Sequence, residues 1–202
     1  MVYKSILFTC LLCVTVFVAI AQKDTFNSDQ SLYLADPTIF QYGGIYYLYG
    51  TIGGNADSGF IAYTSTNLKT WKQSTATPGG YALRKGETYG TKGFWAPQLL
   101  FLNDTFYMIY VANEDIAVAK SSSPLDPFTQ QAPEALHAPV KQIDPFVFAD
   151  DNGKKYLYHV RLSGGNKLYV AELTNDLSAI KEETLKECIT ATSPWENTAN
   201  SN

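Results

Sequence analysis

The sequence contains little cysteine. Only three of its 202 residues are cysteines, and two of them, Cys10 and Cys13, lie in an apolar stretch at the N-terminus. Once that stretch is removed, Cys188 is the only thiol left, so no disulfide can form within the chain. This excludes a small secreted domain held together by disulfides. We expect Cys188 to be a buried, unreactive thiol, because no neighbouring basic group favours its thiolate.

Positive charge is also scarce and scattered. Lys and Arg total 15 against 19 Asp and Glu, which gives a net charge of -4. Phosphate neutralisation needs clustered Lys and Arg, so a nucleic-acid partner is not expected. With 46% hydrophobic and 17% charged residues, the composition is that of a folded globular protein. Aromatic residues make up 14% and suit both β-strands and the apolar faces of sugars.

The first 21 residues have the pattern of a cleaved signal peptide. Lys4 supplies a positive start, Ser5 to Val18 form an almost unbroken apolar run, and Ala19-Ile20-Ala21 resembles a cleavage site before Gln22. A transmembrane anchor is the alternative, but the run is short for a membrane span. We therefore expect residues 1–21 to be removed. The mature protein is expected to be secreted or periplasmic in a bacterium, with no membrane association.

A repeat organises residues 22–202. Each of its three copies pairs two strand-like runs around a turn, at 36–49, 96–110 and 144–158. A third strand is expected at 60–63, 116–119 and 168–171, followed by a polar connection containing a leucine. A repeating sheet of about four short strands is the unit of a β-propeller blade. A β-sandwich is the alternative, but it lacks such self-similarity.

The repeat thus predicts an all-β protein with about three propeller blades, near residues 30–75, 90–130 and 140–185. Because propellers use roughly 4–8 blades, residues 22–202 are interpreted as a partial propeller that is incomplete at its C-terminal end. No helical period competes, and the stretch from Leu173 to Ile189 has room for a turn of helix at most.

An Asp-Pro pair opens the first and third copies, at Asp36-Pro37 and Asp144-Pro145, whereas the second copy has Ala96-Pro97. Proline biases the preceding residue toward extended geometry and belongs near the start of a strand. The first strand of each blade lines the central channel, so both carboxylates should converge there. Asp-Pro is also a common turn pair, which is the alternative. Paired carboxylates suggest glycoside hydrolysis, one activating water and another tuning the acid.

These residues carry a resemblance to glycoside hydrolase family 43. The similar stretches are Ala35–Ile39, Gly93–Leu99 and Ile143–Phe148 followed by Gly153–Tyr158, and the resemblance covers about residues 30 to 195. It implies a five-bladed propeller and inverting hydrolysis of arabinofuranosides, xylosides and related plant polysaccharides. It also implies that Asp36 is the general base, that Asp144 modulates the pKa of the acid and orients the pair, and that Trp95 lines the substrate pocket. The alternative for Trp95 is packing between blades.

The sequence departs from this family at the general acid, a Glu in a Glu-Gly-Pro motif on the fourth blade. No Glu-Gly-Pro occurs among the 202 residues, and Glu196 is interpreted as a loop residue. The chain alone is therefore expected to be nearly inactive on unactivated glycosides. No cofactor is required; the resemblance is compatible with a structural calcium ion, but no metal ligand can be assigned.

Three alternatives remain open on the sequence alone. The chain is an enzyme acting on a carbohydrate, a non-catalytic carbohydrate-binding propeller, or an inactive fragment. A relative of levansucrases and invertases is less consistent, because their nucleophilic Asp has a local context that Ala35–Thr38 does not match. The sugar, the linkage and the oligomeric state are not predicted.

Overall fold

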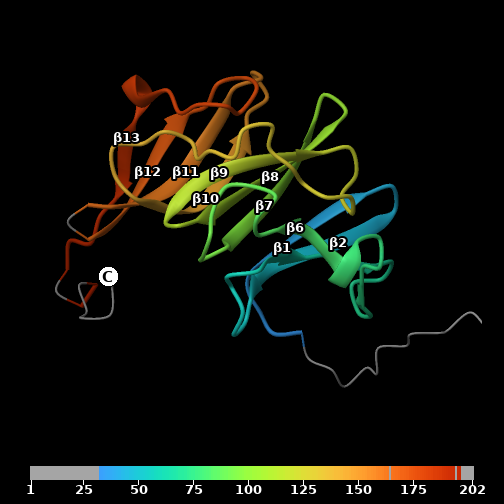
Figure 1. Cartoon of the computed structure of the whole chain (residues 1–202). Helices are drawn as coiled ribbons and strands as arrows, with labels where there is room; N and C mark the ends of the chain where they lie inside the picture. Colours follow the sequence, from blue (N-terminus) through green and yellow to red (C-terminus); the bar gives the residue numbers. More distant parts are fainter. Residues whose placement is uncertain (1–31, 164, 194, 197–202) are drawn as a thin grey trace, which may run out of the picture.

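The computed structural model describes residues 32–163, 165–193 and 195–196, so the predicted signal peptide at 1–21 lies outside the described part. Almost all regular structure there is β (Figure 1). Three antiparallel sheets follow one another along the chain. The first has the order β1-β2-β4-β5, the second β7-β8-β9 and the third β10-β11-β12-β13. We call them the first, second and third blades.

The strands of the first blade are β1 (Leu34–Tyr42), β2 (Ile45–Ile52), β4 (Tyr63–Ser65) and β5 (Lys72–Gln73). Those of the second are β7 (Trp95–Leu102), β8 (Thr105–Ala112) and β9 (Asp115–Ser121). Those of the third are β10 (Gln142–Ala149), β11 (Lys155–Leu162), β12 (Asn166–Glu172) and β13 (Lys186–Ile189). A separate ribbon pairs β3 (Gly59–Ile61) with β6 (Tyr81–Arg84), and two short 3₁₀ helices, η1 (Pro78–Gly80) and η2 (Glu182–Thr184), lie in connections.

The hairpins form where the repeat predicted them. Gly43 and Gly44 join β1 to β2 with φ of 58° and 78°, and Asn103 and Asp104 join β7 to β8 with φ of 48° and 58°. Two central residues with positive φ are typical of a type I′ turn, whose twist matches that of the flanking strands. Glycine and Asn or Asp tolerate this conformation best, which is why these residues terminate the strands.

Two sequence predictions were wrong in detail. The expected third strand at 60–63 of the first repeat is split at Ala62, because β3 leaves the blade to pair with β6 and only β4 pairs with β2. Cys188, expected to be buried, is exposed. It lies on β13, whose four residues are all exposed because this strand is the outer edge of the third blade.

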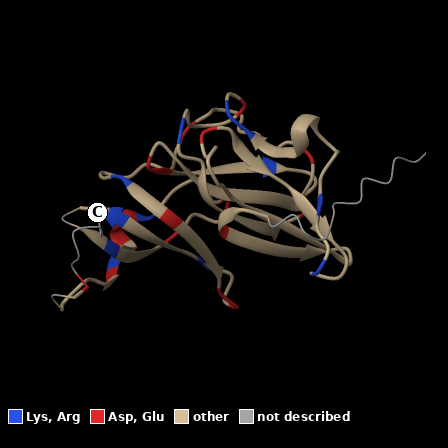
Figure 2. Ribbon diagram, turned by 90° about the horizontal axis from the view of Figure 1, so that it is seen from below, with Lys and Arg blue, Asp and Glu red and all other residues tan. Residues whose placement is uncertain are grey.

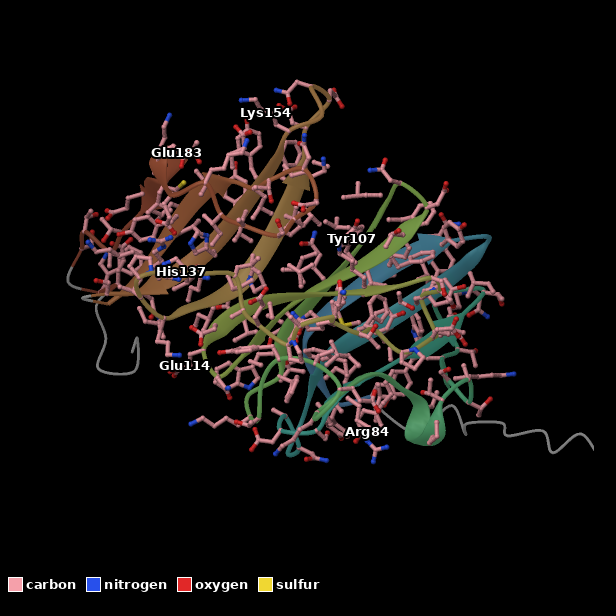
Figure 3. All side chains as sticks on the ribbon, turned by 45° about the horizontal axis from the view of Figure 1, so that its top comes forward. Arg84, Tyr107, Glu114, His137, Lys154 and Glu183 are labelled. Atoms are coloured by element: carbon pink, nitrogen blue, oxygen red, sulfur yellow. The ribbon has the colours of Figure 1, made fainter. Side chains whose placement is uncertain are left out.

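The core consists of two layers, and β8 lies between them. Phe106, Met108 and Tyr110 point into a cluster shared with the first blade, where Tyr49 and Phe60 are fully buried. The alternate residues of β8 point to the opposite face, as the two-residue period of a strand requires. They are Tyr107, Ile109 and Val111, and they pack in a second cluster with Val147 and Leu157 of the third blade. In Figure 3, Tyr107 accordingly lies between the second and third blades.

The first strands of the blades lie next to one another, with β7 in contact with both β1 and β10 (Figure 1). Gln98 of β7 joins two of these strands. Its amide nitrogen donates to the carbonyl oxygen of Val147 at 3.1 Å, and its amide oxygen accepts from the Val147 N–H at 2.6 Å. The side chain thereby pairs the backbone N–H and carbonyl of Val147 on the edge of β10 that faces away from β11. This double hydrogen bond fixes the third blade against the second.

Charged residues of both signs are interspersed over the sheets (Figure 2). On the third blade they form ion pairs, such as Lys154 with Glu172 at 2.9 Å and Lys167 with Glu187 at 3.4 Å. Exposed pairs of this kind contribute about 0–1 kcal/mol each. In the described part of the chain, no helix is long and apolar enough to cross a membrane.

Candidate active site

The Asp-Pro and Ala-Pro pairs occupy the same structural position in all three blades. The register between the first two strands shifts between Ala35 and Thr38, between Trp95 and Gln98, and between Ile143 and Phe146. Each shift is a β-bulge, in which two residues of one strand oppose a single residue of its partner. Bulges bend a strand and redirect side chains, and they are frequent beside active sites.

The prediction of extended backbone before these prolines was wrong. Asp36, Ala96 and Asp144 have φ of 48°, 45° and 53°, which lie in the left-handed region. The bulge explains the difference, because its first residue leaves the pleat so that the ladder can resume two residues later. Left-handed backbone is strained for residues other than glycine and persists where the surrounding structure imposes it. Ala96 has the same conformation but no carboxylate. The bulge is therefore a feature of all three blades, and it forms with or without an acidic side chain.

The structure brings Asp36 and Asp144 together electrostatically. Both residues are exposed to solvent, so water has access to their carboxyl groups. Crowding by nearby protein atoms, and next the negative charge of Asp36, raise the pKa of Asp144 above its ordinary value. A like charge acts in this way only when it is near, because it disfavours loss of the second proton. Two carboxyl groups 108 positions apart in the sequence therefore lie close enough for the charge of one to act on the other.

A residue that the sequence analysis missed joins Asp36 to the second blade. Thr51, on β2, donates its hydroxyl hydrogen bond to Asp36 Oδ2 at 2.8 Å and accepts one from the backbone N–H of Ala96 at 3.0 Å. The only signal in the sequence was a polar residue at the end of a strand whose repeat equivalents are valines. Opposite the same bulge lies Gly50, where an added Cβ would be 2.8 Å from the carbonyl oxygen of Ala35.

Trp95 is partly buried and packs against the second core cluster. Part of the Trp95 side chain therefore packs in the core, as the alternative interpretation expected, and part of it remains accessible to solvent. Its position depends on Gly93, which has φ of 62° and where an added Cβ would be 2.9 Å from the indole ring. Asp57 holds this turn by accepting a hydrogen bond from the Gly93 N–H at 2.7 Å. The indole is thus fixed one residue before the bulge of the second blade.

Glu196 lies in a turn, and its carboxylate accepts backbone hydrogen bonds from Thr192 and Ser193, both at 2.8 Å. These hydrogen bonds lower the pKa of Glu196, which is the opposite of what a general acid needs. Among the described residues, no group of three or more His, Cys, Asp or Glu side chains is placed to hold a metal ion. No calcium ligand can be assigned from these residues.

A cleft of about 530 Å³ lies on the outer parts of the second and third blades and includes none of the predicted site residues. It is lined by Val118, Lys120, residues 129–132 and 134–136, and residues 176–178. Its acidic residues, Glu134 and Asp176, lie in connections between strands. Hydrogen bonds from the hydroxyl and backbone N–H of Ser178 lower the pKa of Asp176, which is the opposite of what a general acid needs. The bulges beside the innermost strands remain the candidate active site.

Comparison with known proteins identifies relatives of this chain. The family described as "Glycosyl hydrolases family 43" matches residues 30–201. A xylosidase/arabinosidase 43A from Humicola insolens is 28% identical over 151 residues, which cover 67% of this chain and 46% of that protein. Among solved structures, an endo-1,4-beta-xylanase from Bacteroides thetaiotaomicron superimposes with a TM-score of 0.74 at 43% identity, covering 82% of this chain and 55% of that one. A thermostable family-43 glycoside hydrolase gives 0.68 at 32% identity, covering 83% and 56%.

The fold and the site together define a partial β-propeller with carboxylates at its innermost strands. The chain belongs to glycosyl hydrolases family 43. Its described sheets correspond to three blades of the five-bladed propeller of that family. The chain spans about half the length of the relatives reported above, from 46% to 56%.

Proposed function

We propose that the complete protein containing this chain hydrolyses O-glycosidic bonds in xylose- or arabinose-containing polysaccharides or oligosaccharides of plant type, with inversion at the anomeric carbon. The observation that supports this most directly is the pairing of Asp36 with Asp144 across two non-adjacent blades, with the pKa of Asp144 raised partly by Asp36. The names of the similar proteins, a xylosidase/arabinosidase and a xylanase, favour pentose substrates.

In the proposed reaction Asp36 is the general base. Its carboxylate takes a proton from a water molecule while the water oxygen bonds to the anomeric carbon and the glycosidic C–O bond breaks. The leaving oxygen takes its proton from a general acid, which the family resemblance places in a Glu-Gly-Pro motif that these 202 residues do not contain. The exposure of Asp36 suits this role, because the base must reach water.

Asp144 is proposed to act on the acid through its negative charge. A nearby anion disfavours loss of a proton, so the general acid stays protonated until the leaving group departs. Trp95 is proposed to offer its accessible surface to a sugar ring while its buried part packs in the core. The protein is expected to act outside the cytoplasm after removal of residues 1–21.

The test compares the complete wild-type protein with D36N, D144N and the control D151N, whose site is an exposed turn residue. Substrates are xylan, arabinan and 4-nitrophenyl glycosides of xylose and arabinofuranose, and NMR of the first-formed anomer reports inversion. D36N should lose at least about 10²-fold in rate on every substrate. D144N should lose activity mainly on substrates with poor leaving groups, and the alkaline limb of its pH profile should move to lower pH.

Full activity in D36N would refute the assignment of the base. Retention of the sugar configuration would contradict the inverting mechanism. If the wild-type protein binds xylan or arabinan but releases no sugar from any substrate, the protein is a carbohydrate-binding propeller and the enzymatic proposal is wrong.

A further inference from the structure

The hydroxyl of Thr51 has a defined direction. The Ala96 N–H can only donate, so its 3.0 Å contact makes Thr51 Oγ1 an acceptor there. An ionised carboxylate can only accept, so at 2.8 Å the hydroxyl hydrogen points to Asp36 Oδ2. Thr51 is 8% exposed, so its own hydroxyl has little access to water. Because both bonds are specified, one oxygen of Asp36 is held in place and the other is left for a water molecule.

The repeat shows that the blade itself does not need this hydroxyl. In the register of the three hairpins, Thr51 pairs with Ala35, Val111 with Trp95 and Val160 with Ile143. Valine thus occupies the equivalent position in the second and third blades, beside bulges of the same shape. Valine and threonine are nearly equal in size, so packing does not explain the threonine. The hydroxyl occurs in the blade that carries Asp36.

The two aspartates consequently differ in their surroundings. Asp36 has a donor on Oδ2, whereas within the described residues the structure places no hydrogen-bond donor on the Asp144 side chain. The blade with Asp144 has Val160 where the blade with Asp36 has Thr51. A base benefits from a donor that holds and stabilises its charged form, while a residue acting through its charge alone does not require one.

We propose that Thr51 is a positioning residue that orients the Asp36 carboxylate toward the attacking water. It does so by linking the carboxylate, through two hydrogen bonds, to the main chain of the second blade. This proposal rests on the proposed function of Asp36 as the base. Because the other end of the link is the backbone of Ala96, Thr51 also sets the position of the base relative to the neighbouring blade. The hydroxyl of Thr51 thereby holds Asp36 Oδ2 in a fixed position beside the bulge of the first blade.

The test uses T51V, T51S and the control T88V in the complete protein. T51V keeps the size of the side chain and copies the residue that the other two blades carry at this position. T88V makes the same chemical change at another buried threonine, one that has no hydrogen bond to either aspartate. Steady-state kinetics on a 4-nitrophenyl glycoside, the pH profile of kcat/KM and the midpoint of thermal unfolding are measured for each variant, with D36N alongside.

T51V should lower kcat by about 10- to 100-fold with little change in KM, because a misplaced base loses rate rather than substrate binding. The acid limb of its kcat/KM profile should move to higher pH, since the ionised carboxylate has lost a donor. T51S should restore most of the rate and the profile, and T88V should match the wild type.

A wild-type kcat and pH profile in T51V would overturn the proposal. So would a T51V variant whose loss of rate follows a lower unfolding midpoint while its pH profile stays unchanged, because that pattern indicates a purely structural link. If instead D36N is as active as the wild type, the proposed function itself fails, and this outcome is distinct from a failure confined to Thr51.

Discussion

Replacing His159 by glutamine should remove a pH-dependent part of the free energy of unfolding. His159 lies on β11 opposite the Asp144 bulge and has no exposed surface. The Nε of Arg161 donates to His159 Nε2 at 3.1 Å, so that ring nitrogen carries no proton, and the Nδ1–H faces the Leu157 carbonyl oxygen at 3.3 Å. Burial, assisted by the positive charge of Arg161, lowers the pKa of His159 to about 4.

The magnitude follows from the difference between the folded and unfolded states. An unfolded histidine has a pKa of about 6.5, so between pH 6.5 and 4 only the unfolded chain binds the extra proton. The stabilisation is therefore fully present above about pH 6.5 and is lost as the pH falls toward 4. A gap of about 2.5 pH units at about 1.36 kcal/mol per unit sets a limit of about 3.4 kcal/mol, of which about 2.5 kcal/mol is lost at pH 4.5.

The assay is unfolding in urea followed by tryptophan fluorescence, at pH 7.5 and pH 4.5. The chain has two histidines, and His137 (labelled in Figure 3) is exposed, so H137Q is a matched control. Wild type and H137Q should lose the same free energy of unfolding between the two pH values. H159Q should lose about 2.5 kcal/mol less than either. An equal loss in H159Q and the wild type would refute the reasoning.

Substitutions at two further positions test the supports of the site. Gly50→Ala should lower the free energy of unfolding by about 1–3 kcal/mol, because its Cβ would lie 2.8 Å from the Ala35 carbonyl oxygen and 2.9 Å from Leu34 Cβ; an unchanged urea midpoint would show that β2 can shift there freely. Gln98→Leu should lower it by about 1–3 kcal/mol for each backbone group left unpaired on buried Val147. Gln98→Glu, which keeps the acceptor and loses the donor, should lie between Gln98→Leu and wild type.

Much of the fold could be predicted because the repeat encodes it three times. The turns at Gly43-Gly44 and Asn103-Asp104 contain the residues that left-handed backbone favours, so the hairpins follow from local chemistry. The short 3₁₀ helix at Glu182–Thr184 also agrees with the expected limit of one helical turn after the third repeat. The departure of β3 toward β6 could not be predicted, because it depends on pairing between segments about 22 residues apart that no turn signal links.

Only part of the candidate site could be predicted from the sequence. The acidic residues were found because Asp36 and Asp144 stand at equal repeat positions with Ala96 between them. Their backbone conformation was not found, because the local preference of a residue before proline was overridden by the bulge. Thr51 was missed for a related reason: its role depends on a hydrogen bond across two blades, and such a contact leaves no periodic pattern in one sequence.

The left-handed backbone at Ala96 has a consequence for protein engineering. Its φ of 45° nearly equals the 48° and 53° of the two aspartates. The second blade thus has the same backbone conformation at this position, with a methyl group in place of the acidic side chain. An aspartate installed there would project from the same kind of bulge as the native pair, without remodelling of the main chain. Replacing Ala96 by aspartate would therefore add a third carboxyl group at the repeat position that Asp36 and Asp144 occupy in their own blades.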